Sequence, residues 1–474
     1  METTQMTSSL TVEQKELQLA NEVFIKQKKY FDTGATLDIK FRKKQLKKIY
    51  TLIEQYEPQM YEAIYKDFRK SEFDTMVSEI QIVKSEINYF LSNLNSLARP
   101  KTVWTNLANF PSKSQVLKEP YGTSFVIGAW NYPYQLTLVP VVAAIAAGNT
   151  VMIKPSGTAA HSQEAMVRMI NDNFPQEYLH VVSGRGSIVE GILQNPFDKV
   201  FFTGSPNTGK DIMRLCANHL TNVTLELGGK SPSVFTKEGI NDVNLQRFTW
   251  GKFFNAGQTC VAPDYVLVPR SEKDKFLAGM KKAMNRVIGD YKTSDFYCQI
   301  ISERHVDNLA KLIDPNKVYC GGVVDRENRL IAPTLLVDVE LSDASMQDEI
   351  FGPILPVLTY DTIDEAVNII RKFPKPLSYH YYTGSNRKVA KTLLEKIPSG
   401  SGCINDSVVF MANHNLPFGG VGNSGMGKYH GSSGFDSFSN EKGVLDRPSY
   451  YEPPFKYLPY TNWKYKLIEF LFKF

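Results

Sequence analysis

Short apolar runs rich in β-branched residues alternate with helical stretches between residues 120 and 230, and this alternation constrains the fold more than any other feature. Five such runs cover residues 124–127, 150–153, 179–182, 199–202 and 223–225. They are apolar on both faces, as strands buried inside a parallel sheet are. The alternation predicts a doubly wound α/β sheet. A second α/β set is expected from about residue 231 to residue 410.

Length and composition narrow the class of protein. A chain of 474 residues is too long for one ordinary core, so we expect two or three domains. The small net charge of +5 gives little support to nucleic-acid binding, and no nucleic-acid partner is expected. The five cysteines have irregular spacings and no CxxC pair, which favours reduced thiols in a cytoplasmic protein over a disulfide framework.

Further local signals concern the N-terminal region, membranes and metals. Residues 1–10 lack the basic and apolar regions of a signal peptide. Thr11 and Gln14 match a capping box at the start of a helical region that runs to about residue 100. The most apolar run, residues 139–148, is too short to span a membrane. The seven histidines lack the spacing of metal ligands, so no metal is expected.

Two glycine-rich segments resemble nucleotide-binding motifs without meeting their requirements. Residues 204–210 match most of a phosphate-binding P-loop, but Asp211 stands where Ser or Thr must hold magnesium. Residues 420–425 have the GxGxxG spacing, yet no strand precedes them, so we interpret them as a structural turn. The segment at Ser205 stays open between two interpretations, a pyrophosphate site at a helix N-terminus and a plain βα turn.

Glu226 and Cys260 are the pair with the most specific chemistry. Glu226 stands in Leu-Glu-Leu-Gly-Gly-Lys, and Cys260 stands in Asn-Ala-Gly-Gln-Thr-Cys-Val. A cysteine that forms a thioester attacks a carbonyl as the thiolate, and a base must later activate water. A carboxylate just after a strand, beside glycines, suits the second task. A cysteine taken alone is more often a small buried hydrophobe, so the catalytic interpretation depends on the surrounding sequence.

These two motifs resemble those of the aldehyde dehydrogenase superfamily, and the resemblance runs from about residue 30 to residue 445. Trp130-Asn-Tyr-Pro resembles its oxyanion segment, and Ile153-Lys-Pro-Ser resembles its adenosine-ribose segment. Phe202-Thr-Gly-Ser resembles its pyrophosphate loop, and Glu349-Ile-Phe-Gly-Pro resembles its nicotinamide-side segment. Residues 416–420 and 425–431 are similar to the class 3 branch, which contains the fatty and aromatic aldehyde enzymes.

By position, the resemblance implies a role for each site residue. Cys260 is implied as the nucleophile and Glu226 as the base for deacylation. The side-chain amide of Asn131 and the backbone N–H of Cys260 are implied as the oxyanion hole. The implied cofactor contacts are Lys154 at the adenosine ribose, Ser205 at the pyrophosphate, Glu349 at the nicotinamide ribose and Phe351 near the nicotinamide ring, together with Trp130, Gly204, Gly209 and Gly228.

One position departs from the pattern of the family. Many members place Glu three residues after the ribose-binding Lys, where it chelates the ribose hydroxyls, but this chain has Gly157. A Glu at that position would repel the additional phosphate of NADP. The chain is therefore expected to use NADP as well as NAD.

The resemblance also implies an architecture. It consists of a Rossmann-like cofactor domain (residues 1–106 and 124–225), a second α/β catalytic domain (residues 226–413) and a small β oligomerisation arm (residues 107–123 and 414–446) that pairs across a homodimer.

The implied reaction is NAD(P)-dependent oxidation of an aldehyde to the carboxylic acid, through a thiohemiacetal and a thioester on Cys260. Two alternatives stay open. A cofactor-free thiol hydrolase or esterase would leave Lys154 and Glu349 without a role. A non-catalytic structural or binding relative predicts damage to catalytic residues that are all present.

Residues 447–474 form a tail that the core motifs do not explain. Trp463, Leu467, Phe470, Leu471 and Phe474 share one face of a helix that begins near residue 461, with mostly lysines opposite. This pattern is typical of a helix lying in a membrane surface, so the protein is expected to be cytoplasmic with peripheral membrane contact. The alternative is that the apolar face docks on the enzyme body, beside the substrate entrance of a partner subunit. Both interpretations favour medium- or long-chain aliphatic or aromatic aldehydes.

Overall fold

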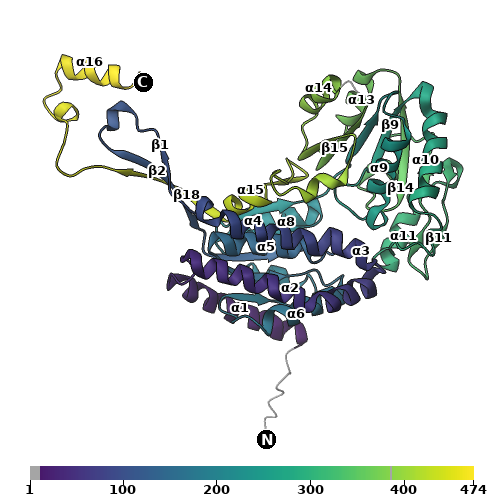
Figure 1. Ribbon diagram of the computed structural model, residues 1–474, viewed down its shortest axis with the longest axis horizontal. Helices are drawn as coiled ribbons and strands as arrows, with labels where there is room; N and C mark the ends of the chain where they lie inside the picture. The colour runs from purple at the N-terminus through teal and green to yellow at the C-terminus, as the bar shows by residue number, and fades with distance from the viewer. Residues whose placement is uncertain (1–10, 385–386, 474) are drawn as a thin grey trace, which may run out of the picture.

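The structure is a computed structural model, and it describes residues 11–384 and 387–473. The expectations for residues 1–10 and for Phe474 lie outside these ranges. A six-stranded sheet and a seven-stranded sheet, each with helices beside it, form the two halves of the body, and an arm that carries the C-terminal tail extends from it (Figure 1). This arrangement confirms the α/β fold class.

The N-terminal helices cover both faces of the first sheet, with the first helix packed on one face and the next long helices packed on the other. They are α1 (Val12–Asp32), α2 (Ile39–Phe68), α3 (Glu72–Thr75), the π-helical turn η1 (Met76–Ile80) and α4 (Gln81–Leu97). At the start of α1, Thr11 Oγ1 accepts from the N–H of Gln14 at 3.2 Å, and Gln14 Oε1 accepts from the N–H of Thr11 at 2.8 Å. The predicted capping box and helical region are therefore confirmed.

The first sheet has the strand order β17-β7-β6-β3-β4-β5, and only β17 is antiparallel to its neighbour. Its strands are β3 (Thr123–Ile127), β4 (Thr150–Lys154), β5 (Leu179–Val181), β6 (Lys199–Thr203), β7 (Asn222–Glu226) and β17 (Gly425–Met426), and its helices are α5 (Gln135–Ala147), α6 (Ala160–Asn171), α7 (Ile188–Ile192) and α8 (Pro206–Ala217). Every residue of β3, β4, β5 and β6 is buried, as their two-sided apolar character predicted. The most apolar run of the sequence lies in α5, which is buried on all sides.

The second sheet has the order β10-β13-β14-β9-β8-β15-β16 and is parallel apart from β10. Its strands are β8 (Pro232–Phe235), β9 (Tyr265–Pro269), β10 (Val318–Cys320), β13 (Thr334–Leu336), β14 (Ile354–Tyr360), β15 (Ser378–Tyr382) and β16 (Ser401–Ile404). The helices of this half are α9 (Asp242–Phe253), α10 (Lys273–Val287), α11 (Glu303–Ala310), α12 (Ala344–Gln347), α13 (Ile363–Ile370) and α14 (Lys388–Lys396). Its short 3-10 turns are η3 (Phe254–Gly257), η4 (Arg270–Glu272), η5 (Pro315–Lys317) and η6 (Val408–Ala412). The strands β11 (Val324–Asp325) and β12 (Leu330–Ile331) form a separate hairpin. Two apolar clusters, one on each face, hold the helices to the sheet.

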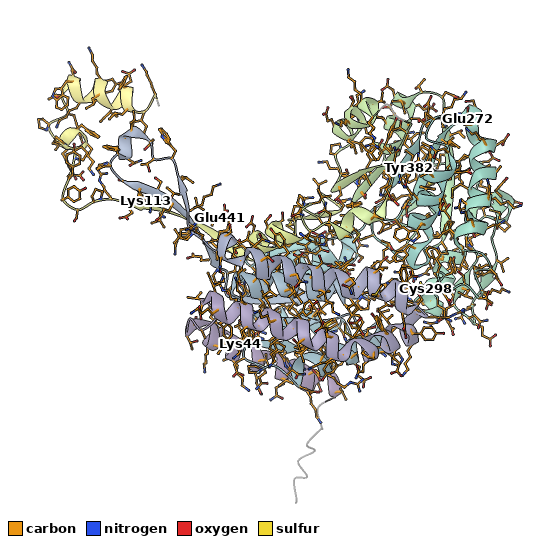
Figure 2. The ribbon with its side chains drawn as sticks, in the orientation of Figure 1. Lys44, Lys113, Glu272, Cys298, Tyr382 and Glu441 are labelled. Atoms are coloured by element: carbon orange, nitrogen blue, oxygen red, sulfur yellow. The ribbon has the colours of Figure 1, made fainter. Side chains whose placement is uncertain are left out.

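The arm is an antiparallel sheet of β1 (Lys101–Val103), β2 (Lys113–Pro120) and β18 (Ser439–Asp446). Figure 2 shows Lys113 and Glu441 on these strands, beyond the body, whereas Tyr382 and Cys298 lie within the second half. β1 thus joins the arm sheet although it precedes residue 107, and β17 and α15 (Gly431–Ser437) pack on the body although they follow residue 414. The domain boundaries themselves stay a prediction.

The tail ends in α16 (Asn462–Leu471), which begins one residue after Thr461 as the sequence predicted. It follows the 3-10 turn η7 (Pro454–Lys456) and lies at the far end of the arm, against η2 (Leu107–Asn109) (Figure 1). Within this chain its apolar face is therefore not covered by the body, and Trp463 stays 56% exposed. Lys464, which the prediction assigned to neither face, is buried, and its Nζ donates to the Tyr457 carbonyl at 2.7 Å.

Two features are absent from the described part of the chain. None of its helices combines the length and the hydropathy needed to cross a bilayer. The same residues contain no group of three or more His, Cys, Asp or Glu side chains arranged to hold a metal ion.

Candidate active site

The segments that follow β3, β4, β6 and β7 line a cavity of about 950 Å³, at the carboxyl edge of the sheet where α/β folds bind their ligands. The structure brings ten of the predicted site residues to this cavity: Trp130, Asn131, Lys154, Gly204, Ser205, Glu226, Gly228, Cys260, Glu349 and Phe351. Gly209 is not among the described lining residues. A Cβ at Gly209 would stand 2.7 Å from Cδ2 of Leu227, so this glycine lets α8 pack closely on the sheet.

A tight left-handed turn presents Cys260. It consists of Asn255, Ala256 and Gly257, with φ values of 55°, 51° and 73°. A Cβ on Gly257 would stand 2.3 Å from the carbonyl oxygen of Gly352, so only glycine fits there. The turn is further fixed by Asn255, whose Nδ2 donates to the Asn131 carbonyl at 3.0 Å and to the Gln258 carbonyl at 3.1 Å.

Cys260 lines the cavity and is partly buried. Burial raises the pKa of the Cys260 thiol, and the carboxylates of Glu349 and Glu226 raise it further. Positive charge that enters the cavity would favour the thiolate.

Asn131 is held beside the Cys260 turn. Its side chain is buried, and Nδ2 donates to the Gln258 carbonyl at 3.1 Å. A primary amide carries two N–H donors, so the second remains to meet a developing negative charge. The preceding residue, Trp130, packs edge-on against Phe351 with ring centroids 5.4 Å apart, which joins the two halves of the body at the cavity.

Glu226 ends β7 with both carboxylate oxygens buried. Neither oxygen has a hydrogen-bond partner among the described residues. Burial raises the pKa of Glu226, and the ammonium of Lys428 opposes this shift. A buried carboxylate with unused acceptors is suited to take a proton from a bound water.

Glu349 lies against the glycine that follows β7. A Cβ on Gly228 would stand 1.9 Å from Glu349 Oε2, so glycine is required for the carboxylate to lie there. Burial raises the pKa of Glu349, with a further contribution from Asp264. The segment that carries Glu349 is held by a buried ion pair that sequence reasoning missed, Lys230 with Asp264 at 2.5 Å.

Lys154 and Ser205 lie at the other end of the cavity. Lys154 Nζ donates to the carbonyls of Pro155 and Gly184, both at 2.7 Å, which leaves one donor of the ammonium. Burial lowers the pKa of Lys154 to about 8. Ser205 caps α8, its Oγ accepts from the N–H of Thr208 at 3.3 Å, and both residues line the cavity, so the start of this helix faces it.

These features fit a dinucleotide. The helix start at Ser205 suits a pyrophosphate, and the donor of Lys154 and the buried acceptor of Glu349 suit ribose hydroxyls. The cavity is large enough for such a ligand and reaches Cys260. The pyrophosphate role of the Ser205 segment stays a prediction, whereas residues 420–425 form the predicted structural turn, with Val421 N–H donating to Ser424 Oγ at 2.9 Å.

Fold and site together fit the class of dinucleotide-dependent enzymes, with a cysteine and a buried carboxylate in the same cavity. Comparison with known proteins gives the family. The profile described as the aldehyde dehydrogenase family matches residues 4–444. The chain belongs to this family, and its reaction is the NAD(P)-dependent oxidation of an aldehyde. The two alternatives, a cofactor-free hydrolase and a non-catalytic relative, are not favoured.

Three relatives show how close the similarity is. The 4,4'-diaponeurosporen-aldehyde dehydrogenase of Staphylococcus aureus is 40% identical over 460 residues, which cover 96% of this chain and 100% of the relative. The mouse (Mus musculus) aldehyde dehydrogenase named dimeric and NADP-preferring is 39% identical over 418 residues, which cover 88% and 92%. The substrate-bound structure of Staphylococcus aureus AldH has a TM-score of 0.93 at 40% identity and covers 95% of this chain and 99% of that one. Family 3 members, such as member H1 of Arabidopsis thaliana at 38% identity over 93% of this chain and 92% of the relative, confirm the class 3 resemblance.

Proposed function

We propose that Cys260, Asn131 and Glu226 carry out the oxidation in the roles that the family resemblance implies. The observation that carries this proposal is that the cavity containing these three side chains also contains Lys154, Ser205 and Glu349. Gly204, Gly228, Trp130 and Phe351 complete the wall on which the dinucleotide lies. When bound, the nicotinamide ring accepts the hydride.

The residues of the chain perform the other steps. The Cys260 thiolate adds to the aldehyde carbon, and the resulting oxyanion accepts from Asn131 Nδ2 and from the backbone N–H of Cys260. Loss of hydride from the thiohemiacetal leaves a thioester on Cys260. Glu226 then takes a proton from water as the oxygen adds to the thioester carbon, the C–S bond breaks, and the acid leaves.

Substitution of the nucleophile tests this assignment. Cys260→Ala should lose aldehyde oxidation while its affinity for NAD, measured by isothermal titration, stays within about twofold, because the thiol is not a nucleotide contact. Cys216→Ala is the matched control, since this buried cysteine lies outside the cavity lining and should keep full activity. Turnover by Cys260→Ala would contradict the proposal.

Gly157 and Arg185 support the use of NADP alongside NAD. A Cβ at Gly157 would stand 2.7 Å from the Gly184 carbonyl oxygen, so this edge of the cavity is open only with glycine. Arg185 is exposed and lines the same cavity, and its guanidinium suits a phosphate. The mouse relative whose name calls it NADP-preferring agrees with this expectation.

Isothermal titration of both cofactors tests the NADP proposal. Arg185→Gln should weaken NADP binding about tenfold and leave NAD binding unchanged, because only NADP carries the additional phosphate. Gly157→Glu should penalise NADP more than NAD, and Gly157→Ala is the control that adds the steric conflict without the charge. Equal losses for both cofactors in Arg185→Gln would contradict the proposal.

The substrate proposed for this site is a medium- or long-chain aliphatic or aromatic aldehyde. The aromatic rings of Trp250 and Phe254 stack at 4.6 Å and pack with Tyr132 and Leu136 next to the Asn131 segment, so the surroundings of the reacting carbon are apolar. The Staphylococcus aureus relative is named for the aldehyde of diaponeurosporene, which agrees. Catalytic efficiency should rise with aldehyde chain length, and equal efficiency for short and long aldehydes would contradict this.

The arm and the tail are proposed as contact surfaces. The edge of β18 that faces away from β2 is unpaired within the described chain, and such an edge favours pairing across a homodimer. The exposed Trp463 and Tyr465 beside Lys466 on α16 favour peripheral binding of a cytoplasmic enzyme to an anionic membrane. Sedimentation equilibrium tests the dimer. Co-sedimentation with anionic liposomes tests the membrane contact when the full-length protein is compared with a variant that lacks residues 461–474. Equal binding of the two proteins would show that the tail is not the membrane contact.

A further inference from the structure

Lys428 lies beside the deacylating base without any role in the family assignment made above. It stands between β17 and α15, and its Nζ donates to the carbonyls of Gly400, at 3.0 Å, and Gly419. A Cβ on Gly419 would stand 2.8 Å from Glu226 Oε1 and 2.9 Å from Lys428 Cδ. The space that a Cβ on Gly419 would fill therefore borders both the Glu226 carboxylate and the Lys428 side chain.

Lys428 also lines a second cavity. This cavity, of about 380 Å³, is lined mainly by polar side chains that include Lys428, Asn222, Thr224 and Asp436. Lys428 is half-buried. Burial lowers the pKa of Lys428, and the Glu226 carboxylate opposes this shift. The two carbonyls that accept from its Nζ favour the charged ammonium over the neutral amine.

The charge balance around Glu226 depends on this lysine. Three titratable groups face the carboxylate: Lys428, the phenol of Tyr429 and the thiol of Cys260. Tyr429 and Cys260 become negative when they ionise, which disfavours a second negative charge on Glu226. Lys428 is the cation of the three, and Glu226 has no hydrogen-bond partner among the described residues that could replace it.

We propose that Lys428 is a positioning residue for the base: across the space that the missing side chain of Gly419 leaves, it favours the carboxylate form of Glu226, so that water activation continues at lower pH. The inference rests on the proposed role of Glu226 as the base. In each turnover Glu226 gains one proton from the attacking water and must release it before the next, and a positive neighbour favours that release.

Deacylation measured without nucleotide tests the proposal. Cys260 is acetylated with p-nitrophenyl acetate, excess ester is removed, the pH is jumped, and intact mass follows the decay of the acetyl-enzyme. Acylation at one fixed pH separates this step from the ionisation of Cys260. Lys428→Gln, which keeps a hydrogen-bond donor but no charge, should move the midpoint of the pH profile upward by about one unit. Below the midpoint its decay should be about tenfold slower than that of the unmodified protein.

Two further variants complete the test. Lys428→Arg keeps the charge and should retain the original midpoint, whereas Lys428→Met, a second uncharged variant, should show the same shift as Lys428→Gln. An unchanged midpoint in either uncharged variant, or a shift in Lys428→Arg, would overturn the proposal. Glu226→Gln separates this outcome from a failure of the proposed function: decay as fast as in the unmodified protein would mean that Glu226 is not the base, whatever Lys428 does.

Discussion

The buried pair of Lys230 and Asp264 should control both the stability of the second half and the affinity for nucleotide. Lys230 Nζ lies 2.5 Å from Asp264 Oδ2 and also donates to the carbonyls of Ser345 and Asp348, each at 2.9 Å. Asp264 Oδ1 accepts from the N–H of Ile350 at 2.9 Å. The residues on both sides of Glu349 are therefore fixed to one ion pair.

Asp264→Asn is the perturbation that isolates the charge. Asparagine keeps an oxygen for the N–H of Ile350 but leaves the Lys230 ammonium buried without its counter-charge. Removal of one partner from a buried pair costs about 3–5 kcal/mol. For a unit of this size each kcal/mol lowers Tm by about 2–4 °C, so the melting of the second half should fall by roughly 6–20 °C.

Differential scanning calorimetry and isothermal titration with NAD give the two readouts. The affinity of Asp264→Asn for NAD should fall because Glu349 loses its fixed position. The double variant Lys230→Met with Asp264→Leu replaces the pair by apolar groups, so it should recover thermal stability but not affinity, since the bonds to Asp348 and Ile350 are gone. Native melting together with native affinity in Asp264→Asn would refute the reasoning.

Three further outcomes are expected. Asn131→Ala should lower kcat by about 10²–10³-fold in steady-state assays while NAD affinity is kept, because one oxyanion donor is lost; an unchanged kcat would remove Asn131 from the mechanism. Addition of NAD should accelerate alkylation of Cys260 by iodoacetamide at neutral pH, since the positive nicotinamide ring favours the thiolate, and no acceleration would contradict this. Because burial raises the pKa of Glu226, deacylation should be lost as the pH falls through that raised value, at a higher pH than for an exposed carboxyl, as a pH-jump profile would show.

Much of the fold could be predicted because its signal is local. The five predicted strand runs of the first sheet all became strands, since two-sided burial requires apolar residues throughout. The start of α16 was predicted from the helical spacing of its apolar residues. Its location against η2, and the burial of Lys464, could not be predicted, because both depend on the path of the arm in space.

In the site, too, features with a local sequence signal could be predicted and features that depend on the path of the chain in space could not. Cys260 and Glu226 were predicted from chemistry and motif, and the structure brings them to one cavity. Lys428 belongs to the class 3 segment of residues 425–431, but its relation to Glu226 could not be predicted, because it arises only where the segment after β17 folds back towards Gly419. Asn255 belonged to the quoted cysteine motif, but its bonds to Asn131 and Gln258 follow from a left-handed turn that no residue type specifies.

The ionisation of Lys154 was also beyond sequence reasoning. A lysine in the ribose-binding motif was expected to offer its charge to the cofactor. In the structure two of its donors are used by the carbonyls of Pro155 and Gly184, and burial lowers its pKa to about 8. The exposed cation at this end of the cavity is Arg185, which the motif analysis did not single out.

The central claim is that an aldehyde is oxidised through a thioester on Cys260 that Glu226 hydrolyses. The most direct measurement is the intact mass of Glu226→Gln after mixing with an aldehyde and NAD, followed by peptide mapping. The account predicts one equivalent of reduced nucleotide per site and an acyl adduct located on Cys260 that persists after the unmodified protein has returned to its original mass. Rapid continued turnover with no adduct, or an adduct on another residue, would contradict it.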